Sequence, residues 1–159
     1  MIFEFIVAAM LFFSIIFYVI SFMSGSVSAA SVDLQSGVLE SRTVRISEML
    51  VRTKGVWNQG IPVSPGLVSW RGWPVLSSEK IGWLESYCRS SSGYDALRQN
   101  TGLLEGAFGR TYELKITVAN KTDVLADCGK VREELKKASI RRFGVSETGD
   151  ILTVDVTVS

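Results

Sequence analysis

The stretch ILTVDVTVS, residues 151–159, alternates apolar and polar side chains from end to end. Because neighbouring side chains of a strand point to opposite faces, this spacing predicts a strand with one buried face and one wet face. TYELKITVAN, residues 111–120, repeats the alternation and predicts a second such strand. ASIRRFGVSETGD, residues 138–150, predicts a third strand and a hairpin turn at 147–150.

The segment between the second and third predicted strands is less regular. KVREELKK, residues 130–137, has the composition of a helix, with Val131 and Leu135 pointing inward. The alternative is a strand through residues 123–128. We therefore expect either a short helix or one more strand before the third strand.

Two short helices are predicted upstream of the strands. LSSEKIGWLESYCRSS, residues 76–91, predicts a helix that Ser77 or Ser78 caps. GYDALRQNTG, residues 93–102, predicts a second helix, which Gly102 closes. All three prolines and all four tryptophans lie in residues 56–88, and this composition predicts an extended loop ahead of the first of these helices. The residues expected on the apolar face of that helix are Ile81, Leu84 and Cys88.

The chain begins with MIFEFIVAAMLFFSIIFYVISFMSG, residues 1–25, which carries a single charge, at Glu4. About 20 helical residues span roughly 30 Å, the thickness of a membrane's hydrocarbon layer. The apolar residues Val32, Leu39 and Ile46 then recur every seven positions, which is typical of an amphipathic helix that continues to Gly55. The sequence thus predicts a single helix of roughly 50 residues.

Together these elements predict an α+β fold in which a long N-terminal helix, apolar and then amphipathic, packs on a small antiparallel β-sheet with short helices. We expect a transmembrane or filament-core helix at 1–24 and its amphipathic continuation at 25–54. An extracytoplasmic α+β domain at 55–159 is expected to follow.

The start of the chain permits two interpretations. SVSAAS, residues 26–31, has the small residues of a signal-peptide cleavage site, so cleavage near Ala30 is one alternative. No basic residue precedes the apolar run, as a signal peptide would require. The second interpretation is that a short basic leader has been removed, which predicts a basic residue followed by Gly or Ala just ahead of Met1 in the precursor.

Composition argues against several classes of function. The net charge of +1 gives no global field for nucleic acid, so no nucleic-acid partner is expected. The chain has no histidine and only two cysteines, Cys88 and Cys128, which argues against metal and haem sites built on these residues. We expect no cofactor. The cysteines are either a disulfide or two buried thiols, and an extracytoplasmic location favours the disulfide.

Catalytic patterns are weak. Ser77 and Lys80 match the S-x-x-K spacing of Ser–Lys acyl-transfer enzymes, but the companion motifs are absent and a capped helix with a solvated lysine explains them better. We therefore predict that the chain is not an enzyme. The basic residues of 130–142 are interrupted by glutamates and predict a solvated face. The tryptophans predict either a loop packed on the sheet, which we favour, or a carbohydrate-binding or adhesion surface.

The sequon Asn120-Lys121-Thr122 follows the strand predicted at 111–120 and lies in a predicted turn. A sequon is an acceptor for N-glycosylation in exported proteins. Asn120 is therefore a predicted glycosylation site.

The long helix followed by an antiparallel sheet resembles type IV pilins and their archaeal relatives. The middle of the chain is similar to archaeal pilin-like proteins, in which a G-x-P…W segment precedes a helix, a Y-x-x-L helix, a G-L turn and a strand. The matching segments here are GIPVSPGLVSW, GWPVLSSEKIGWLESYC, GYDALRQNTGL and YELKITV. This resemblance covers most of the chain through short and degenerate motifs.

The resemblance implies a structural subunit of an archaeal type IV pilus-like surface filament. It also implies a prepilin peptidase that removes the leader, pilus assembly machinery, a membrane location before assembly and a homo-oligomeric helical filament at the cell surface. In bacterial members a Glu at the fifth mature position meets the terminal amine of a neighbour. Glu4 is one position away from that match, and the alternative is an interfacial charge at the lipid headgroups. The predicted filament-core residues are Met1, Glu4, Ala8, Ala9, Phe12, Ile16 and Ile20.

The alternative function is a monomeric, membrane-anchored binding or accessory protein, such as a minor pilin. Such an anchor needs only the span, whereas the amphipathic continuation beyond it favours the filament subunit. Abundance at the cell surface would separate a major subunit from a minor one.

Overall fold

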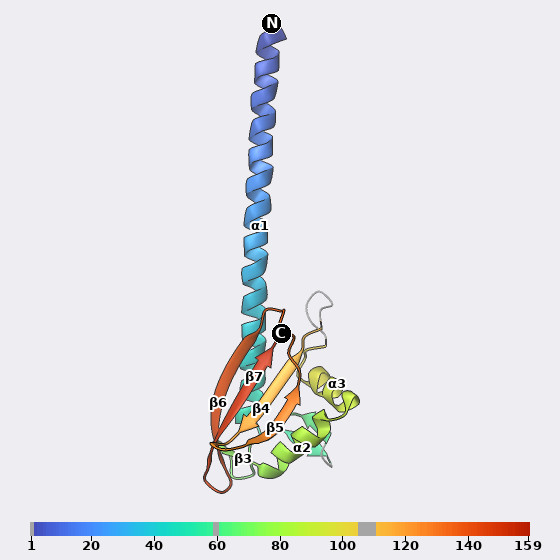
Figure 1. The fold of residues 1–159 in the computed structure, drawn as a ribbon, viewed down its shortest axis with the longest axis vertical. Coiled ribbons are helices and arrows are strands. Elements are labelled where there is room, and N and C mark those ends of the chain that lie inside the picture. The colour runs from blue at the N-terminus through green and yellow to red at the C-terminus, as the bar shows by residue number, and fades with distance from the viewer. Residues whose placement is uncertain (1, 59–60, 105–110) are drawn as a thin grey trace. The chain divides into compact units, whose positions relative to one another are not determined.

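The computed structural model describes residues 2–58, 61–104 and 111–159, and for residues 2, 4, 5, 8 and 23–35 it describes the backbone alone. The elements follow one another along the chain as Figure 1 shows. They are α1 (Ile2–Arg52), β1 (Val56–Asn58), β2 (Ile61–Ser64), β3 (Val75–Leu76), α2 (Ser78–Cys88), α3 (Ser91–Asn100), β4 (Leu114–Ala119), β5 (Val124–Gly129), β6 (Ala138–Ser146) and β7 (Ile151–Val158). The chain forms two compact units, Met1–Val38 and Leu39–Ser159, and we call the second unit the head.

A five-stranded sheet forms the centre of the head, in the strand order β3-β6-β7-β4-β5. The middle strand is β7, the stretch whose alternation is the most regular, and it pairs antiparallel with both neighbours. In this register Val156 lies opposite Ile116 on one side and Ile140 on the other. Apolar residues thus stand side by side across three strands, because the period of two puts them all on one face. The three strands predicted within residues 111–120, 138–150 and 151–159 are confirmed as β4, β6 and β7.

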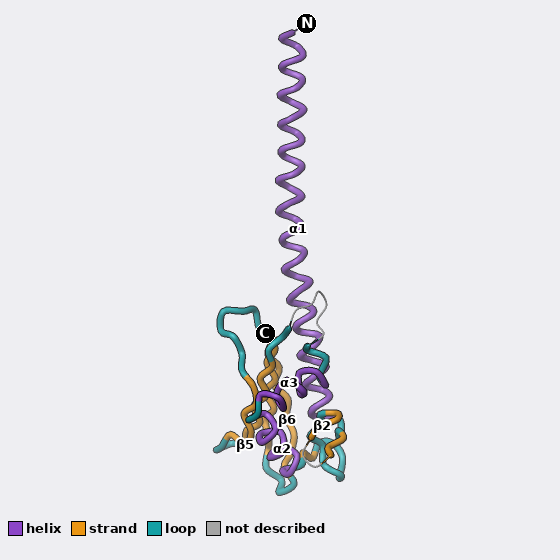
Figure 2. The backbone as a smooth tube through the Cα atoms, turned by 90° about the vertical axis from the view of Figure 1, so that its right-hand side faces the viewer, coloured by secondary structure: helices purple, strands orange, loops and turns teal. Residues whose placement is uncertain are grey.

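Helices meet the apolar face of this sheet in a single core. Leu114, Val118 and Val154 of the sheet are fully buried, and α1, α2 and α3 add Leu50, Ile81, Leu84 and Leu97 to the same cluster. Figure 2 shows α2 and α3 alongside the strands of the sheet. Burial of such side chains contributes roughly 1.5–3 kcal/mol each, so this cluster is the main source of the head's stability.

The predicted short helices are confirmed with small changes at their ends. α2 begins after Ser77, whose backbone is extended but whose side chain makes no cap hydrogen bond. α3 begins after Ser90, whose hydroxyl accepts a hydrogen bond from the backbone N–H of Gly93 at 3.1 Å. Gly102 has a φ of 74°, a left-handed conformation that suits glycine and ends the helix as expected.

The last part of α1 belongs to the head. Leu39 and Ile46 are buried there, as the seven-residue spacing predicts, and Leu50 is buried on the same stripe. The side chain of Val32 lies outside the described residues. Two polar side chains on the same face are also satisfied. The buried Thr43 hydroxyl donates to the carbonyl of Leu39 at 2.7 Å, and the Arg142 guanidinium donates to the hydroxyl of Ser47 at 3.3 Å.

The predicted fold is wrong in its description of the N-terminal helix. The prediction packed a long apolar helix against the sheet. In the structure, the apolar stretch with a continuous description of its side chains is helical and covers residues 9–22. From Met10 to Phe22 these side chains are exposed, and burial in the head starts only at Leu39. The physical reason is that a helix apolar on every side has no single face to pack on a sheet, whereas the stripe from Leu39 onward does.

The sheet also differs from the prediction, because it is mixed. β3 runs parallel to β6, with Val75 opposite Val145, while the other pairs are antiparallel. Within the described part of the chain, no helix combines the length and apolar character that crossing a membrane requires.

Two local predictions need correction. The segment at 56–75 is not all loop, since β1 and β2 form a two-stranded antiparallel sheet. The helix predicted at 130–137 is absent, and the segment is a turn in which Leu135 is exposed. Eight residues are too few to hold a helix without tertiary packing, and Leu135 contributes none because the core is already filled from the sheet. The alternative strand is instead present as β5.

Candidate functional site

The exposed apolar surface of α1 is the most unusual feature of the described residues. Between positions 10 and 22 every side chain is exposed, including Met10 at 67% and Phe17 at 75%. Since successive helical residues turn by about 100°, a run of this length presents apolar groups in all directions. Sequence positions 5–32 carry no charge. We call the described residues 9–22 the apolar collar.

The polar groups inside the apolar collar are few, and Ser14 is satisfied within the helix. Its hydroxyl donates to the carbonyl of Met10, one turn earlier, at 2.8 Å. Aromatic side chains lie against each other along the surface, with ring centroids 6.4 Å apart for Tyr18 and Phe22. A surface of this kind is stable only where lipid or other apolar side chains replace water.

Four of the predicted filament-core residues fall on the apolar collar. Ala9, Phe12, Ile16 and Ile20 follow one another at spacings of three and four, so they share one face of the helix. Phe12 and Ile20 are exposed, Ile16 is exposed at 36%, and Ala9 is half-buried. Met1 lies outside the described residues, and the same holds for the side chains of Glu4 and Ala8.

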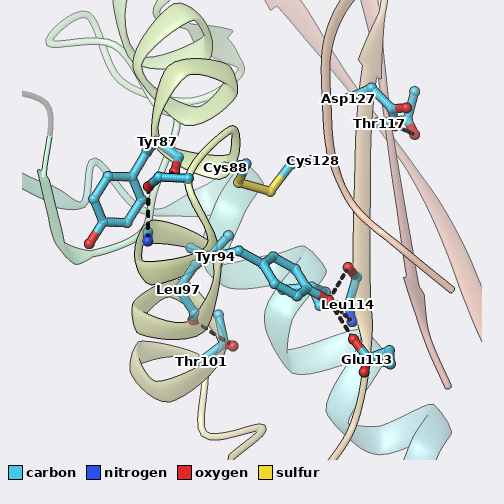
Figure 3. Close-up of a disulfide and its surroundings, with 12 residues drawn as sticks. Tyr87, Cys88, Tyr94, Leu97, Thr101, Glu113, Leu114, Thr117, Asp127 and Cys128 are labelled. Carbon is cyan, nitrogen blue, oxygen red and sulfur yellow. Dashed lines mark hydrogen bonds between the residues drawn. A yellow bond between two sulfur atoms is a disulfide. The ribbon is translucent and has the colours of Figure 1, made fainter.

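The predicted disulfide between Cys88 and Cys128 is present (Figure 3). It joins the last residue of α2 to β5 across a Cα–Cα distance of 5.3 Å, with 40 residues of sequence between them. The alternative of two buried free thiols is therefore wrong. Cys128 lies within β5, so the bridge joins a helix to a strand.

Tyr94 of α3 lies next to the disulfide and contacts the start of β4 through its hydroxyl (Figure 3). The Tyr94 hydroxyl accepts a hydrogen bond from the N–H of Leu114 at 3.0 Å and lies 2.9 Å from the Glu113 carboxylate, to which it donates. Burial, and then Glu113, raises the pKa of Tyr94. Gly129 has a φ of 87°, and a Cβ there would collide with the Leu114 carbonyl and the Tyr94 ring, so only glycine fits.

Lys80, the basic residue of the S-x-x-K pattern, contacts backbone carbonyls. The Lys80 ammonium donates to the carbonyls of Lys54 and of Val68, at 2.5 and 2.8 Å. Burial, and then the nearby Lys54, lowers the pKa of Lys80. The lysine therefore ties α2 to the end of α1 and to the segment before β3, which is a structural role.

The basic residues near β6 meet acidic partners. The Arg141 guanidinium donates to both carboxylate oxygens of Asp155, at 2.7 and 2.9 Å, and these hydrogen bonds raise the pKa of Arg141. Arg142 lies 3.9 Å from Glu48. The first pair joins β6 to β7 and the second joins β6 to α1. Exposed basic residues at 130, 132, 136, 137 and 141 agree with the solvated face that was predicted. Among the described residues no cluster of three or more His, Cys, Asp or Glu could hold a metal ion.

The predicted glycosylation site lies in the turn between β4 and β5. The Asn120 side-chain oxygen accepts hydrogen bonds from the backbone N–H groups of Thr122 and Asp123, at 2.8 and 2.6 Å. This local pattern is an Asx-turn, which explains why the hairpin turns here. Glycosylation of Asn120 stays a prediction.

A polar cleft of about 390 Å³ lies between α1 and the end of α3 within the head. Arg42, one of its walls, donates to the carbonyl of Gly102 at 3.1 Å and covers the Tyr112 ring at 4.7 Å. Asn100 donates to the carbonyl of Pro62 at 2.7 Å. These two side chains are engaged in holding the head together. The cleft is lined by Arg42, Arg45, Ile46, Met49, Gln99, Asn100, Thr101 and Gly102.

The four tryptophans divide into two pairs. Trp57 and Trp83 pack together, with ring centroids 5.9 Å apart, and the Trp57 indole donates to the carbonyl of Gly66 at 2.8 Å. Trp70 and Trp73 are exposed at 78% and 63%. The favoured prediction of a loop packed on the sheet is wrong for the exposed pair, while Trp57 packs against the core and Trp83 belongs to α2. The sequence gives a weak signal for the difference, because Gly72 stands between the exposed pair and marks a turn.

Comparison with protein families, with curated proteins and with solved structures finds no match to this chain.

Proposed function

We propose that this chain is a structural subunit of a surface filament similar to an archaeal type IV pilus, and that it assembles through the apolar collar of α1. The observation that supports this most directly is the exposure of apolar side chains in every direction from Met10 to Phe22. Packing among identical helices removes all of that surface from water, at roughly 25 cal/mol for each Å² buried.

Several features of the apolar collar suit packing between copies. Small residues at Ala9, Ser14 and Ser21 allow helices to approach closely. The face that includes Phe12, Ile16 and Ile20 offers side chains that can interdigitate with those of a neighbour. Before assembly, the same side chains would need the apolar environment of a lipid membrane.

The head would then form the outside of the filament. Its own core is closed without the apolar collar, because residues 39–51 of α1 complete it. Charges on its outer sheet face are paired, as between Arg141 and Asp155. A subunit of this kind functions at the cell surface and needs a homo-oligomeric partner more than a ligand.

The proposal is tested by imaging sheared surface material from the native cells by electron microscopy and identifying the subunit by mass. Ile16→Asp places a charge in the proposed filament core, where it cannot be hydrated, and we expect loss of filaments. The matched control is Ile151→Asp, the same change at an exposed isoleucine of the head, which should leave filaments intact. Ala9→Arg provides a second test within the collar.

Formation of the disulfide on a non-reducing gel verifies that each variant still folds. Filaments of unchanged abundance in Ile16→Asp and Ala9→Arg cells would refute packing through the apolar collar. If the unmodified protein occurs only as a monomer in the membrane fraction, the anchored accessory protein is the correct description.

A further inference from the structure

Trp70 and Trp73 lie in the turn that connects Val68 to β3, where Val68 and Leu76 form an antiparallel bridge. Figure 1 shows the position of β3 in the head. Tryptophan is highly buried on average, so two exposed indoles three residues apart on one loop are unusual. Neither the head's core nor the proposed filament packing explains them. We call residues 69–75 the tryptophan hairpin.

The tryptophan hairpin has a fixed backbone. The Ser69 N–H donates to the Val75 carbonyl at 2.8 Å. Two further backbone hydrogen bonds, both of 3.0 Å, run from the Gly72 N–H to the Ser69 carbonyl and from the Val75 N–H to the Gly72 carbonyl. The hairpin is also attached to the sheet, since Val145 N–H donates to the Pro74 carbonyl at 2.9 Å. The indoles are therefore presented on a rigid support, which reduces the entropy lost on binding.

Polar groups lie next to the exposed rings. The Arg71 guanidinium lies 5.5 Å from the Trp70 ring centroid. The Ser69 hydroxyl donates to one carboxylate oxygen of Glu147 at 2.8 Å, which holds that side chain beside the hairpin. Arg71 has several N–H donors, and the Glu147 carboxylate has lone pairs beyond the one that Ser69 uses.

The balance of charge identifies the class of ligand. Arg71 and Glu147 carry opposite charges, so together they leave no net charge beside the rings, and the ammonium of Lys80 is bound to backbone carbonyls. An anionic membrane would need an excess of basic groups, which the tryptophan hairpin lacks. A neutral ligand with an apolar face for the indoles and hydroxyls for Arg71 and Glu147 fits better, and a pyranose sugar has both.

From this geometry we propose that the tryptophan hairpin binds neutral oligosaccharides built from pyranose sugars. Their flat C–H faces stack on Trp70 and Trp73, while Arg71 donates to hydroxyl oxygens and Glu147 accepts from hydroxyl groups. This binding site is independent of the apolar collar, so it can exist whether or not the chain forms a filament.

The test uses the full chain in a zwitterionic detergent without a sugar headgroup, and the probes are cellopentaose and chitopentaose. Titration followed by tryptophan fluorescence should give saturable binding of at least one probe. Trp70→Ala and Trp73→Ala should each weaken that binding by about tenfold or more. Leu135→Ala is the control, since it removes an exposed apolar side chain next to the opposite end of β6 and should leave affinity unchanged.

Far-UV circular dichroism and the intact disulfide verify that the variants are folded. No saturable binding of either probe would overturn the proposal, and so would equal affinities for the Trp70→Ala variant and the unmodified chain. Binding to vesicles of mixed neutral and anionic phospholipid that Trp70→Ala and Trp73→Ala weaken, with no binding of either sugar, would overturn it in favour of a membrane contact. Filaments should still form in cells with both tryptophan substitutions, which separates this test from that of assembly.

Discussion

The two ends of α1 use apolar residues in opposite ways. In the apolar collar, residues 9–22, the large apolar side chains are exposed, whereas Leu39, Ile46 and Leu50 in the head are almost fully buried. The composition of both parts is rich in apolar residues, so composition alone does not decide which part is buried. What differs is periodicity, because polar residues confine the apolar ones to one stripe only in the second part. A stripe can be covered by the chain's own sheet, and a fully apolar helix cannot.

The largest expected effect is on the free energy of unfolding, when a large apolar side chain is replaced by alanine in each of these two parts. Leu50→Ala should lower the free energy of unfolding of the head by about 3–5 kcal/mol, because it leaves a cavity at a fully buried position. Ile16→Ala, in the apolar collar, should change it by less than about 0.5 kcal/mol. Urea unfolding of the full chain in detergent, followed by tryptophan fluorescence, measures both. Equal losses would mean that the collar is part of the folded core.

A second comparison concerns how the head is held together without the collar. Replacing both Cys88 and Cys128 by Ser should lower the free energy of unfolding by about 3–4 kcal/mol, since the bridge closes a loop of 40 residues. The same urea titration measures the loss, with the unmodified chain under reducing conditions as the control. A midpoint that neither the double substitution nor reduction shifts would contradict a stabilising role for the bridge.

A smaller effect compares two helix starts within the head. Ser90→Ala should lower the free energy of unfolding by about 1 kcal/mol, because the Ser90 hydroxyl caps the Gly93 N–H. Ser77→Ala is the matched control, since Ser77 makes no side-chain cap hydrogen bond, and it should lose less. Thermal unfolding of the two variants side by side ranks them. A larger loss for Ser77→Ala would show that capping is not what Ser90 contributes.

The smallest effect is a pH dependence of the free energy of unfolding that arises from Tyr94. Because burial raises the pKa of Tyr94 above its ordinary value of 10, the folded chain holds this proton more tightly than the unfolded chain. Its contribution to stability is complete below about pH 10 and is lost as pH rises through the folded pKa. Tyr94→Phe should lower the free energy of unfolding by about 1 kcal/mol at pH 8, through the lost hydrogen bonds.

The difference between Tyr94→Phe and the unmodified chain should therefore shrink as the pH rises above about 10. Lys80, whose lowered pKa acts in the opposite direction, is present in both proteins and cancels in this comparison. Unfolding titrations at several pH values measure the difference. If the difference in the free energy of unfolding between the two proteins stays constant over that range, titration of Tyr94 is excluded as its cause.

Periodicity in the sequence was sufficient to predict the strands β4 and β7, because each has one wet face and therefore alternates. The strand β6 was also predicted, although ASIRRFGVS does not alternate regularly. Periodicity also predicted α2 and α3, whose ends are marked by serines and by Gly102. It failed at residues 130–137, where helix propensity had no tertiary contact to support it. It also gave no indication of β3, because two residues are too short to show a period.

The functional sites divide in the same way. The sequence by itself determined that residues 5–32 carry no charge and that two cysteines were available for a disulfide. Only the tertiary structure decided that Cys88 and Cys128 are paired, that Trp57 and Trp83 pack together, and that Trp70 and Trp73 remain exposed. The reason is that charge and periodicity are properties of neighbouring residues, whereas pairing and exposure depend on contacts between segments far apart in the chain.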